Sequence, residues 1–409
     1  MIAQAGGARR GRASYIAAAG VFAVGMAGTT LPTPLYGLYR ERIGFSELVV
    51  TVVFAVYAIG VIAALLIAGD FSDVLGRRPV LVAALVLSLL SAVCFLFQNG
   101  LPLLFTGRLL SGFSAGLFSG AATAAVLELA PPGREARAAF AATAANMGGL
   151  GCGPLLSGIL AQYAPWPLRL PFLVHIALLL AALAVTFALP ETVARRTPRP
   201  PLRPQGMVVP PQTRAAFVPA GLAAFAGFSL LGLFTAVAPS FLEETLGEDN
   251  LAVIAAVVFS VFGSSTAGQL LTGRVGPRRA LPAGCLLMTA GMAVVATSLL
   301  VESLAVLVVG AMIGGLGQGM SFRAGLTGVS AAAPEEHRGA TISAFFVVAY
   351  VGISVPVVGV GALALALDLR DAGMLFAVYV VLMSAAVGVH LLRRPPSPRS
   401  GLPRRGPRT

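Results

Sequence analysis

Apolar runs of about 20 residues or more recur along all 409 positions of this chain, and most charged residues lie between these runs. A helix needs about 20 apolar residues to cross a bilayer core of roughly 30 Å, because each residue adds about 1.5 Å. Hydrophobic residues make up 57% of the chain, charged residues make up 11%, and the mean hydropathy is +0.88. A transmembrane barrel would show short alternating strands instead. The pattern predicts an all-α membrane protein embedded in the lipid bilayer.

The apolar windows predict twelve transmembrane helices in two groups of six. The first group covers residues 14–39, 46–69, 79–98, 102–129, 136–162 and 168–189. The second group covers residues 215–241, 251–272, 279–300, 304–332, 338–365 and 370–392. We therefore expect a six-helix bundle at 14–190, a Pro- and Arg-rich linker at 191–214, a second bundle at 215–392, and tails at 1–13 and 393–409.

The arginines orient these spans, because short cytoplasmic loops retain basic residues. All 28 basic residues of the chain are Arg. Of these, 22 fall in the tails, the linker and the alternate loops that an even number of spans puts on the same side. The loops of the opposite side hold four, namely Arg40, Arg42, Arg169 and Arg370. We expect both termini to be cytoplasmic and the protein to lie in a bacterial cytoplasmic (inner) membrane.

Several classes of function are not expected from this composition. The net charge of +12 comes from arginines at span ends, without the polar stretches that form a nucleic-acid face. Cys94, Cys152 and Cys285 fall in separate spans without the spacing of a disulfide framework or a metal site. No nucleophile pattern or pair of acids stands within the spans. We therefore expect no nucleic-acid partner, no metal, no cofactor and no enzymatic activity.

A charged hinge, GDFSDVLGRRPV at residues 69–80, separates the second and third spans. It places Asp70, Asp73, Arg77 and Arg78 within ten residues of a sparsely charged chain. Gly76 allows a tight turn with positive φ before the next helix starts. This spacing predicts a helix, a turn and a second helix. The alternative is a set of solvated loop charges that only obey the positive-inside rule.

An internal repeat supports the division into six plus six helices. The fourth span carries RLLSGFSAG from Arg108, and the tenth carries GAMIGGLGQG from Gly310, so that Gly112 aligns with Gly314. Each span is followed by a loop with Pro and then Arg. A copy of the hinge, GQLLTGRVGPRRA from Gly268, keeps the glycine and the arginines but lacks the acids. Parallel repeats of six helices around a midplane site are typical of transporters.

These motifs resemble those of the major facilitator superfamily, and in particular its 12-helix drug:proton antiporters. The hinge matches the family's loop signature at Gly69, Asp73, Gly76, Arg77 and Arg78. The Arg108 segment resembles the span-4 motif of proton-coupled members, with Ser111 in the place where Gln is usual. GGLGCGPLLSG, with Gly149, Gly153, Pro154 and Gly158, resembles the span-5 antiporter motif, and LPET at 189–192 resembles a drug-exporter span-6 ending.

The resemblance implies two pseudo-symmetric six-helix bundles that work by alternating access. It further implies that Asp73 latches onto span 11 in the outward-facing state and that Arg77 pairs with Glu128 in a charge relay. The span-5 glycines are expected to allow close packing between the two halves, or simply ordinary helix packing.

Spans 1, 4, 7 and 10 line the cavity in this family, so their polar and aromatic residues are candidates, together with one amide of span 5. The candidates for substrate binding or proton coupling are Thr29, Thr30, Tyr36, Arg108, Ser111, Asn146, Phe228, Gln318 and Arg323. A charge inside a span costs at least ~2.5 kcal/mol at the bilayer centre, which favours a functional role for Arg108. For Arg323, and less so for Arg108, a snorkelling side chain is the alternative.

The sequence supports the identity of the coupling ion less strongly than it supports the fold. No acid lies at the middle of a span, and the first span lacks the acid that many drug antiporters carry there. His175 lies close to the outer end of span 6, where a structural role is expected. An aromatic and sparsely charged cavity favours hydrophobic compounds over sugars. We predict a monomeric secondary transporter that exports such compounds in exchange for protons. The alternatives are an importer of a sugar, organic acid or other metabolite, and a non-transporting receptor or scaffold.

Overall fold

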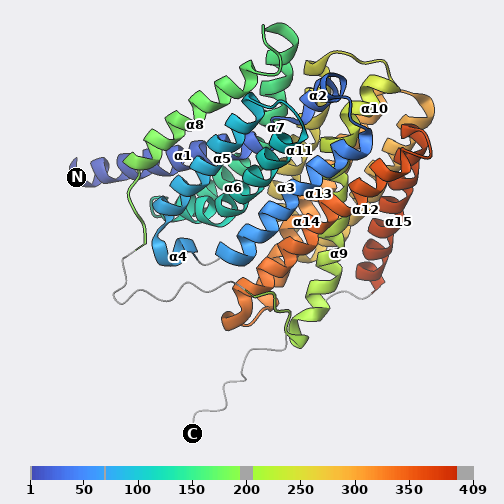
Figure 1. Ribbon diagram of the computed structural model, residues 1–409. Helices are drawn as coiled ribbons and strands as arrows, with labels where there is room; N and C mark the ends of the chain where they lie inside the picture. Colours follow the sequence, from blue (N-terminus) through green and yellow to red (C-terminus); the bar gives the residue numbers. More distant parts are fainter. Residues whose placement is uncertain (1, 69–70, 194–205, 394–409) are drawn as a thin grey trace.

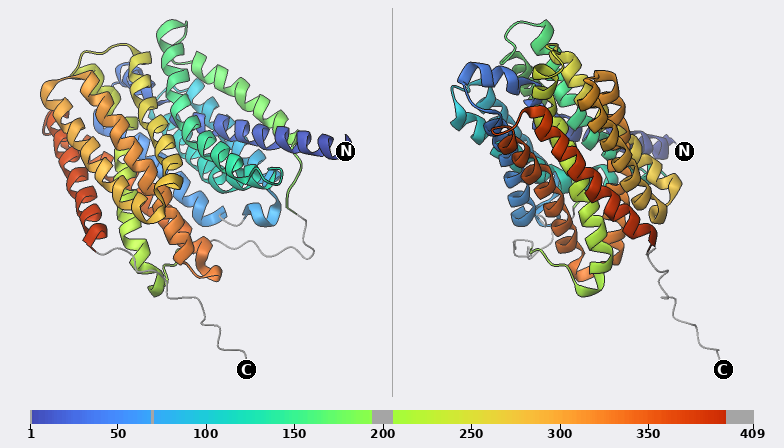
Figure 2. Two further views of the ribbon diagram at one scale, coloured as in Figure 1. Left: turned by 180° about the vertical axis from the view of Figure 1, so that it is seen from behind. Right: turned by 90° about the vertical axis from the view of Figure 1, so that its right-hand side faces the viewer.

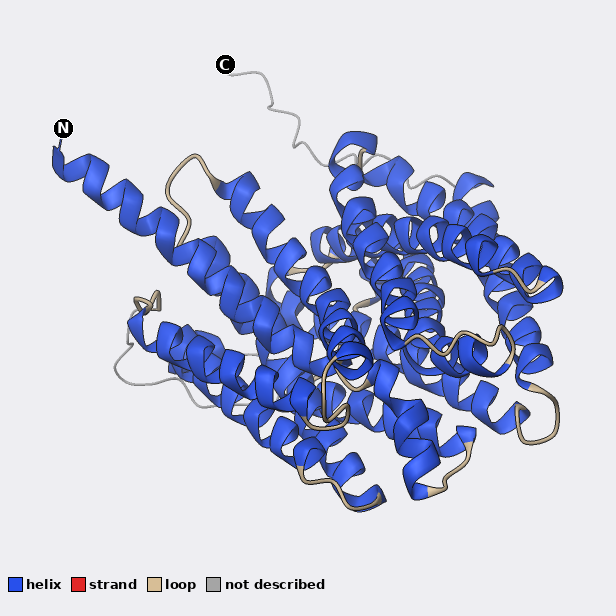
Figure 3. Ribbon diagram, turned by 90° about the horizontal axis from the view of Figure 1, so that it is seen from above, coloured by secondary structure: helices blue, strands red, loops and turns tan. Residues whose placement is uncertain are grey.

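The computed structural model describes residues 2–68, 71–193 and 206–393 as a helical protein, and no strand occurs in these ranges (Figure 3). The helices of the first half are α1 (Ile2–Thr30), α2 (Tyr36–Ile43), α3 (Glu47–Ala68), α4 (Phe71–Leu75), α5 (Arg77–Leu96), α6 (Leu101–Glu128), α7 (Glu135–Tyr163) and α8 (Leu170–Ala188). The helices of the second half are α9 (Arg214–Gly232), α10 (Ala238–Glu244), α11 (Leu251–Val275), α12 (Pro277–Val301), α13 (Leu304–Ala332), α14 (Arg338–Leu363) and α15 (Leu369–Arg393).

Twelve segments of the described chain are long and apolar enough to cross a membrane, as the sequence predicts. Two of them depart from α-helical geometry in the interior of the span. Pro32 and Pro34 lack the backbone N–H that continues a helix, so α1 ends at Thr30 and a 3₁₀ turn (Thr33–Leu35) leads into α2. The seventh span contains a π-helical turn (Leu233–Val237) between α9 and α10.

The helix packing repeats between the two halves, which confirms the pseudo-symmetric bundles (Figures 1 and 2). In the first bundle, α6 packs against α3, α5 and α1, and α7 packs against α1. In the second bundle, α13 packs against α11, α12 and α9, and α14 packs against α9. The two bundles meet where α7 lies along α11 and where α3 lies along α14, and these two contacts are equivalent under the repeat.

The surface of the structure has the apolar character that a lipid environment requires. Large hydrophobic side chains such as Ile59, Phe97 and Leu382 are each at least 60% exposed. Other apolar side chains on the same helices are buried, including Phe54 on α3 and Phe376 on α15. The spans are therefore apolar on both their inner and their outer faces.

Candidate transport cavity and its two ends

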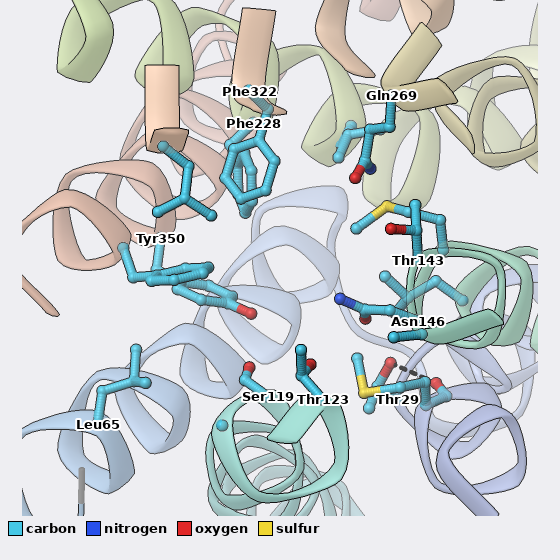
Figure 4. Close-up of a pocket in the computed structure, with 18 of the residues that line it drawn as sticks. Thr29, Leu65, Ser119, Thr123, Thr143, Asn146, Phe228, Gln269, Phe322 and Tyr350 are labelled. Atoms are coloured by element: carbon cyan, nitrogen blue, oxygen red, sulfur yellow. Dashed lines mark hydrogen bonds between the residues drawn. The ribbon is translucent and has the colours of Figure 1, made fainter. Parts of the chain in front are cut away.

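A cavity of about 670 Å³ lies between the two bundles (Figure 4). Its walls come from α1, α3, α6 and α7 on one side and from α9, α11, α13 and α14 on the other. From Arg108 it extends along α6 through Ser119 and Thr123 to Leu127, where Asp73 of α4 and Gly339 of α14 also line it. We call this end, which carries α4, the hinge end. The opposite end carries α2 and α10 (Figure 1).

Aromatic rings from both bundles form much of the cavity wall. Tyr57 of α3 and Tyr350 of α14 lie edge to face, with ring centroids 6.2 Å apart across the boundary between the bundles. Phe228 of α9 contacts Tyr350 at 5.6 Å and Phe322 of α13 at 5.3 Å. Hydroxyl and amide groups face these rings, including Thr143 and Asn146 of α7 (Figure 4). Most of the exposed wall area is apolar, which suits a largely apolar ligand.

Arg108 lies at the deep end of the cavity and is only 1% exposed. Its Nη1 donates a 2.5 Å hydrogen bond to the carbonyl oxygen of Thr29, in the last turn of α1 before the proline break. Its guanidinium carbon lies 5.3 Å from the ring centroid of Phe54 and 4.7 Å from that of Tyr57. Cation–π contacts of this kind offset part of the cost of burying the charge.

The second cavity arginine, Arg323 of α13, is half-buried nearer the hinge end. Its Nη1 donates a 3.0 Å hydrogen bond to the carbonyl oxygen of Gln269 on α11. Neither Arg108 nor Arg323 forms a salt bridge within the part of the chain that the structure describes. The one carboxylate among the cavity-lining residues belongs to Asp73, which is paired with Arg77 at 2.6 Å.

Six of the nine predicted cavity residues line the cavity: Thr29, Thr30, Arg108, Asn146, Phe228 and Arg323. The structure places Tyr36, Ser111 and Gln318 in the protein interior instead, each at most 3% exposed and none of them in the cavity wall. Gln318 accepts a 2.6 Å hydrogen bond from Ser265. Its helical position alone did not distinguish a cavity-facing amide from one that joins two helices.

At the hinge end, the predicted pairing of Arg77 with Glu128 is confirmed. Arg77 donates from Nη2 and Nε to the two carboxylate oxygens of Glu128, at 2.8 and 3.2 Å. Its Nη1 also pairs with Asp73 and donates to the hydroxyl of Ser72, both at 2.6 Å. Arg77 therefore ties α4 to the start of α5 and to the end of α6. Of the predicted latch residues, Gly69 lies outside the described residues.

Glu191 belongs to the same cluster, which the sequence did not indicate. Its carboxylate accepts hydrogen bonds from the backbone N–H groups of Arg77 and Arg78 at 2.9 and 3.0 Å. A carboxylate at the N-terminus of α5 also interacts favourably with the helix dipole. Glu191 follows span 6 in the chain, yet these partners are the orphan N–H donors at the start of another helix, α5. The next residue, Thr192, donates to Glu128 at 2.5 Å.

Gly76 and Arg78 complete the hinge end. Gly76 precedes α5 with φ of 106°, which confirms the predicted positive φ, and Gly276 of the repeated hinge has φ of 84°. The guanidinium of Arg78 stacks over the ring of Phe187 on α8, 5.4 Å from its centroid. The Arg78 side chain is therefore held against α8 and is not a fully solvated loop charge.

The opposite end is closed by polar contacts that run between the bundles. Arg40 of α2 pairs with Glu47 at 2.9 Å and with Glu244 of α10 at 2.5 Å. Ser240 of α10 donates to the same Glu47 oxygen at 3.0 Å. Farther around the boundary, the side chain of Gln162 accepts from the backbone N–H of Leu251 at 2.9 Å. From the sequence, Arg40 is predicted only to lie in an outer loop. Its pairing with Glu244 could not be predicted, because Glu244 is about 200 positions away.

The span-5 glycines divide their contacts between two neighbours. A Cβ at Gly149 or Gly153 would collide with the backbone of α1, within the first bundle. A Cβ at Gly158 would lie 2.5 Å from Ala255 of α11, in the second bundle. Packing between the two halves was expected from this glycine set, but only Gly158 of the predicted residues provides it. Pro154 lies inside α7 between these two contact regions.

The aromatic residues of α3 and α14 that line the cavity are not among the residues predicted from the sequence. Phe54, Tyr57 and Tyr350 lie on spans 2 and 11, whereas candidates were sought mainly on spans 1, 4, 7 and 10. In the sequence each of them is one aromatic residue within a long apolar run, and such a run does not show which side chains face the cavity.

Solved structures of several membrane transporters share this fold. A crystal structure of a POT family transporter in complex with a thioalcohol-conjugated peptide matches with a TM-score of 0.75, over 94% of this chain and 96% of the other, at 12% identity. The human organic anion transporter MFSD10 matches with a TM-score of 0.66, over 92% and 99% of the two chains, at 18% identity. At these identities the similarity establishes the fold alone.

Curated relatives match over shorter segments. The class B tetracycline resistance protein of Escherichia coli is 31% identical over 145 residues, which are 35% of each chain. The class D tetracycline resistance protein of Salmonella ordonez is 32% identical over 124 residues, which are 30% of each chain. The chain thus matches about a third of the length of these relatives. The sequence model of the Major Facilitator Superfamily matches residues 17–357, with a second match at 265–408. The chain therefore belongs to the Major Facilitator Superfamily.

Proposed function

We propose that this transporter works by alternating access and exports small, mostly apolar compounds in exchange for protons. The observation that carries the proposal is the cavity between the bundles, which reaches the hinge end, while contacts such as Arg40 with Glu244 hold the opposite end closed. In an alternating-access cycle, the site between the two bundles is open to one side of the membrane at a time. A cavity that extends to the hinge end only fits one of these two states.

The charge distribution supports an orientation of the protein in the membrane. The hinge end shares its side with the arginine-rich loops and the linker, which the positive-inside rule assigns to the cytoplasm. The structure then corresponds to an inward-facing state in a bacterial inner membrane, with both termini cytoplasmic. Both bundles belong to one chain, so we expect a monomer to be sufficient.

Export is favoured over import by two features. The exposed area of the cavity wall comes mostly from apolar atoms of rings and aliphatic side chains, which favours an apolar compound over a sugar. The two curated relatives named above are tetracycline resistance proteins. The proton is the part of the proposal that depends most on the resemblance to antiporters, because Asp73 is the one acidic side chain among the cavity-lining residues.

The experiment is a susceptibility assay in an efflux-deficient bacterial host, followed by transport into inverted vesicles with tetracycline as the probe. We expect protection of the host, and we expect uptake into vesicles that an uncoupler abolishes. Protection against no compound of a broad panel contradicts export, and uptake insensitive to the uncoupler contradicts the proton. Accumulation of probe by intact cells instead of exclusion indicates the importer, and no movement in either direction indicates a receptor or scaffold.

A further inference from the structure

The polar atoms at the deep end of the cavity point to a ligand with a negative charge. Arg108 uses only Nη1 for a hydrogen bond, to Thr29. Its Nε and Nη2 are buried and have no hydrogen-bond partner among the described residues. Buried donors of a charged group are costly when they are unpaired. The free N–H groups of Nε and Nη2 point from the same edge of the planar guanidinium, and this edge matches the two oxygens of a carboxylate.

The charge balance of the cavity favours the same ligand. Among the cavity-lining residues, Arg108 and Arg323 are cationic and Asp73 is acidic. Asp73 and Glu128 contact the same guanidinium of Arg77, and Glu128 is 20 residues along α6 from Arg108, so about 30 Å separate the two ends of this wall. Asp73 is moreover paired with Arg77. Neither cavity arginine is therefore neutralised by a described carboxylate, and an anion that enters the cavity supplies the missing charge.

The surroundings of Arg108 define the rest of the ligand. The rings of Phe54 and Tyr57 cover the guanidinium, and the Tyr57 ring leads to Tyr350 and Phe228 across the bundle boundary. A flat aromatic body next to the carboxylate would lie among these rings, where aromatic contacts and area burial both contribute. We infer that the cavity binds aromatic monocarboxylates, with the carboxylate on the free edge of Arg108 and the ring among these aromatic side chains. This inference rests on the proposed transport function and specifies its substrate class.

The test compares three probes with one ring system and different head groups: 2-naphthoate, 2-naphthamide and 2-naphthylmethylammonium. Binding to the purified chain in lipid nanodiscs is measured by calorimetry at pH 7, and the series is repeated with biphenyl analogues. We expect each carboxylate to bind at least about tenfold more tightly than its amide, and the ammonium compounds to bind most weakly. Equal affinities of carboxylate and amide, tighter binding of the ammonium, or no binding by either carboxylate would overturn the inference.

Two variants assign the preference to Arg108. In Arg108→Gln, the carboxylate should bind only as tightly as the amide, whereas the affinity of the amide should change less than threefold. Arg108→Lys retains the charge without the two-donor edge, and an intermediate ratio is expected. A carboxylate preference that survives in Arg108→Gln assigns it to another residue and overturns the proposed site. The amide serves as the internal control for folding, because its binding requires an intact cavity.

Failure of this inference and failure of the proposed function give different results. If the carboxylates bind with the expected preference but uncoupler-sensitive efflux is absent, the transport proposal fails and the ligand class stands. If tetracycline efflux is driven by protons and the carboxylates show no preference, the ligand class fails alone.

Discussion

Arg77 makes most of the polar side-chain contacts at the hinge end. Of its charged partners, Asp73 should contribute least to the stability of the fold. Asp73 is 61% exposed, whereas Arg77 retains Glu128 through two hydrogen bonds when Asp73 is removed. We predict that Asp73→Asn abolishes transport and lowers the unfolding free energy by less than about 1 kcal/mol, because exposed ion pairs contribute little to stability. Vesicle uptake and thermal unfolding of the same preparation measure the two effects.

Thr272 provides the control for Asp73, because it stands four residues after the first glycine of the repeated hinge, Gly268, as Asp73 does after Gly69. Its hydroxyl donates to the carbonyl oxygens of Gly268 and Met320, and it has no charge to contribute. Thr272→Val should leave most of the transport rate. Equal losses in the two variants, or wild-type uptake in Asp73→Asn, would rule out a specific role of the acid.

Gly76 allows a second prediction at the level of one residue. Gly76→Ala and Gly276→Ala both place a side chain at positive φ with extended ψ, which costs about 1–3 kcal/mol. At Gly76 the added methyl group would also lie 2.5 Å from the Glu191 carboxylate, whereas at Gly276 nothing lies within 4 Å. We expect Gly76→Ala to lower the unfolding midpoint in detergent clearly more than Gly276→Ala. Similar midpoints would mean that the contacts of Glu191 with α5 do not stabilise the protein.

At the scale of elements, the contact of α7 with α11 closes the end that carries α2 and α10. Gly158→Val would place its Cβ 2.5 Å from Ala255 and from the carbonyl oxygen of Leu251, so α11 must move away. Gly148, on the same helix, has nothing within 4 Å of an added Cβ. We predict that vesicle uptake falls at least about tenfold in Gly158→Val and less than twofold in Gly148→Val. Overpacking of this size costs about 1–3 kcal/mol, which is enough to disfavour the closed contact.

The helices themselves were predictable because length and hydropathy decide them. The fourth span was expected at 102–129 and is found at Leu101–Glu128, and the helix breaks at Pro32 and Pro34 fall where proline removes a donor. The cavity wall was less predictable. Phe54 is buried beside Arg108 and Ile59 on the same helix is 60% exposed, yet both stand in one uninterrupted apolar run. In a membrane protein, hydropathy does not distinguish a side chain that faces lipid from one that faces the cavity.

Contacts between distant segments were the other part that the sequence did not reveal. The pair of Arg77 with Glu128 was expected from the family resemblance, and it is present. The roles of Glu191 at the start of α5 and of Glu244 beside Arg40 depend on the packed bundle, because each partner lies more than 100 positions away. No local pattern of residues indicates such pairs.

At the scale of the whole molecule, the state that is open at the hinge end is in equilibrium with a state that is open at the opposite end. Arg40 contacts carboxylates of both bundles, and its partner across the boundary, Glu244, is 45% exposed, so this pair contributes about 0.2–1 kcal/mol. We predict that Arg40→Gln shifts the population toward the state open at that end by up to about fivefold. The measurement is the rate at which an impermeant maleimide modifies Thr123→Cys from that side, in a chain whose Cys94, Cys152 and Cys285 are replaced by Ser. An unchanged or slower rate would show that Arg40 does not hold this end closed.

The most direct test of alternating access is a pair of distances between spin labels, measured by double electron–electron resonance in proteoliposomes. Ala136 and Glu336 are exposed at the hinge end on opposite bundles, and Ser46 and Asp249 are exposed at the other end. Labels at each pair are compared with and without Gly158→Val. Alternating access predicts that the substitution lengthens the Ser46–Asp249 distance and shortens the Ala136–Glu336 distance. A change at one end alone, or an increase at both ends, would contradict it.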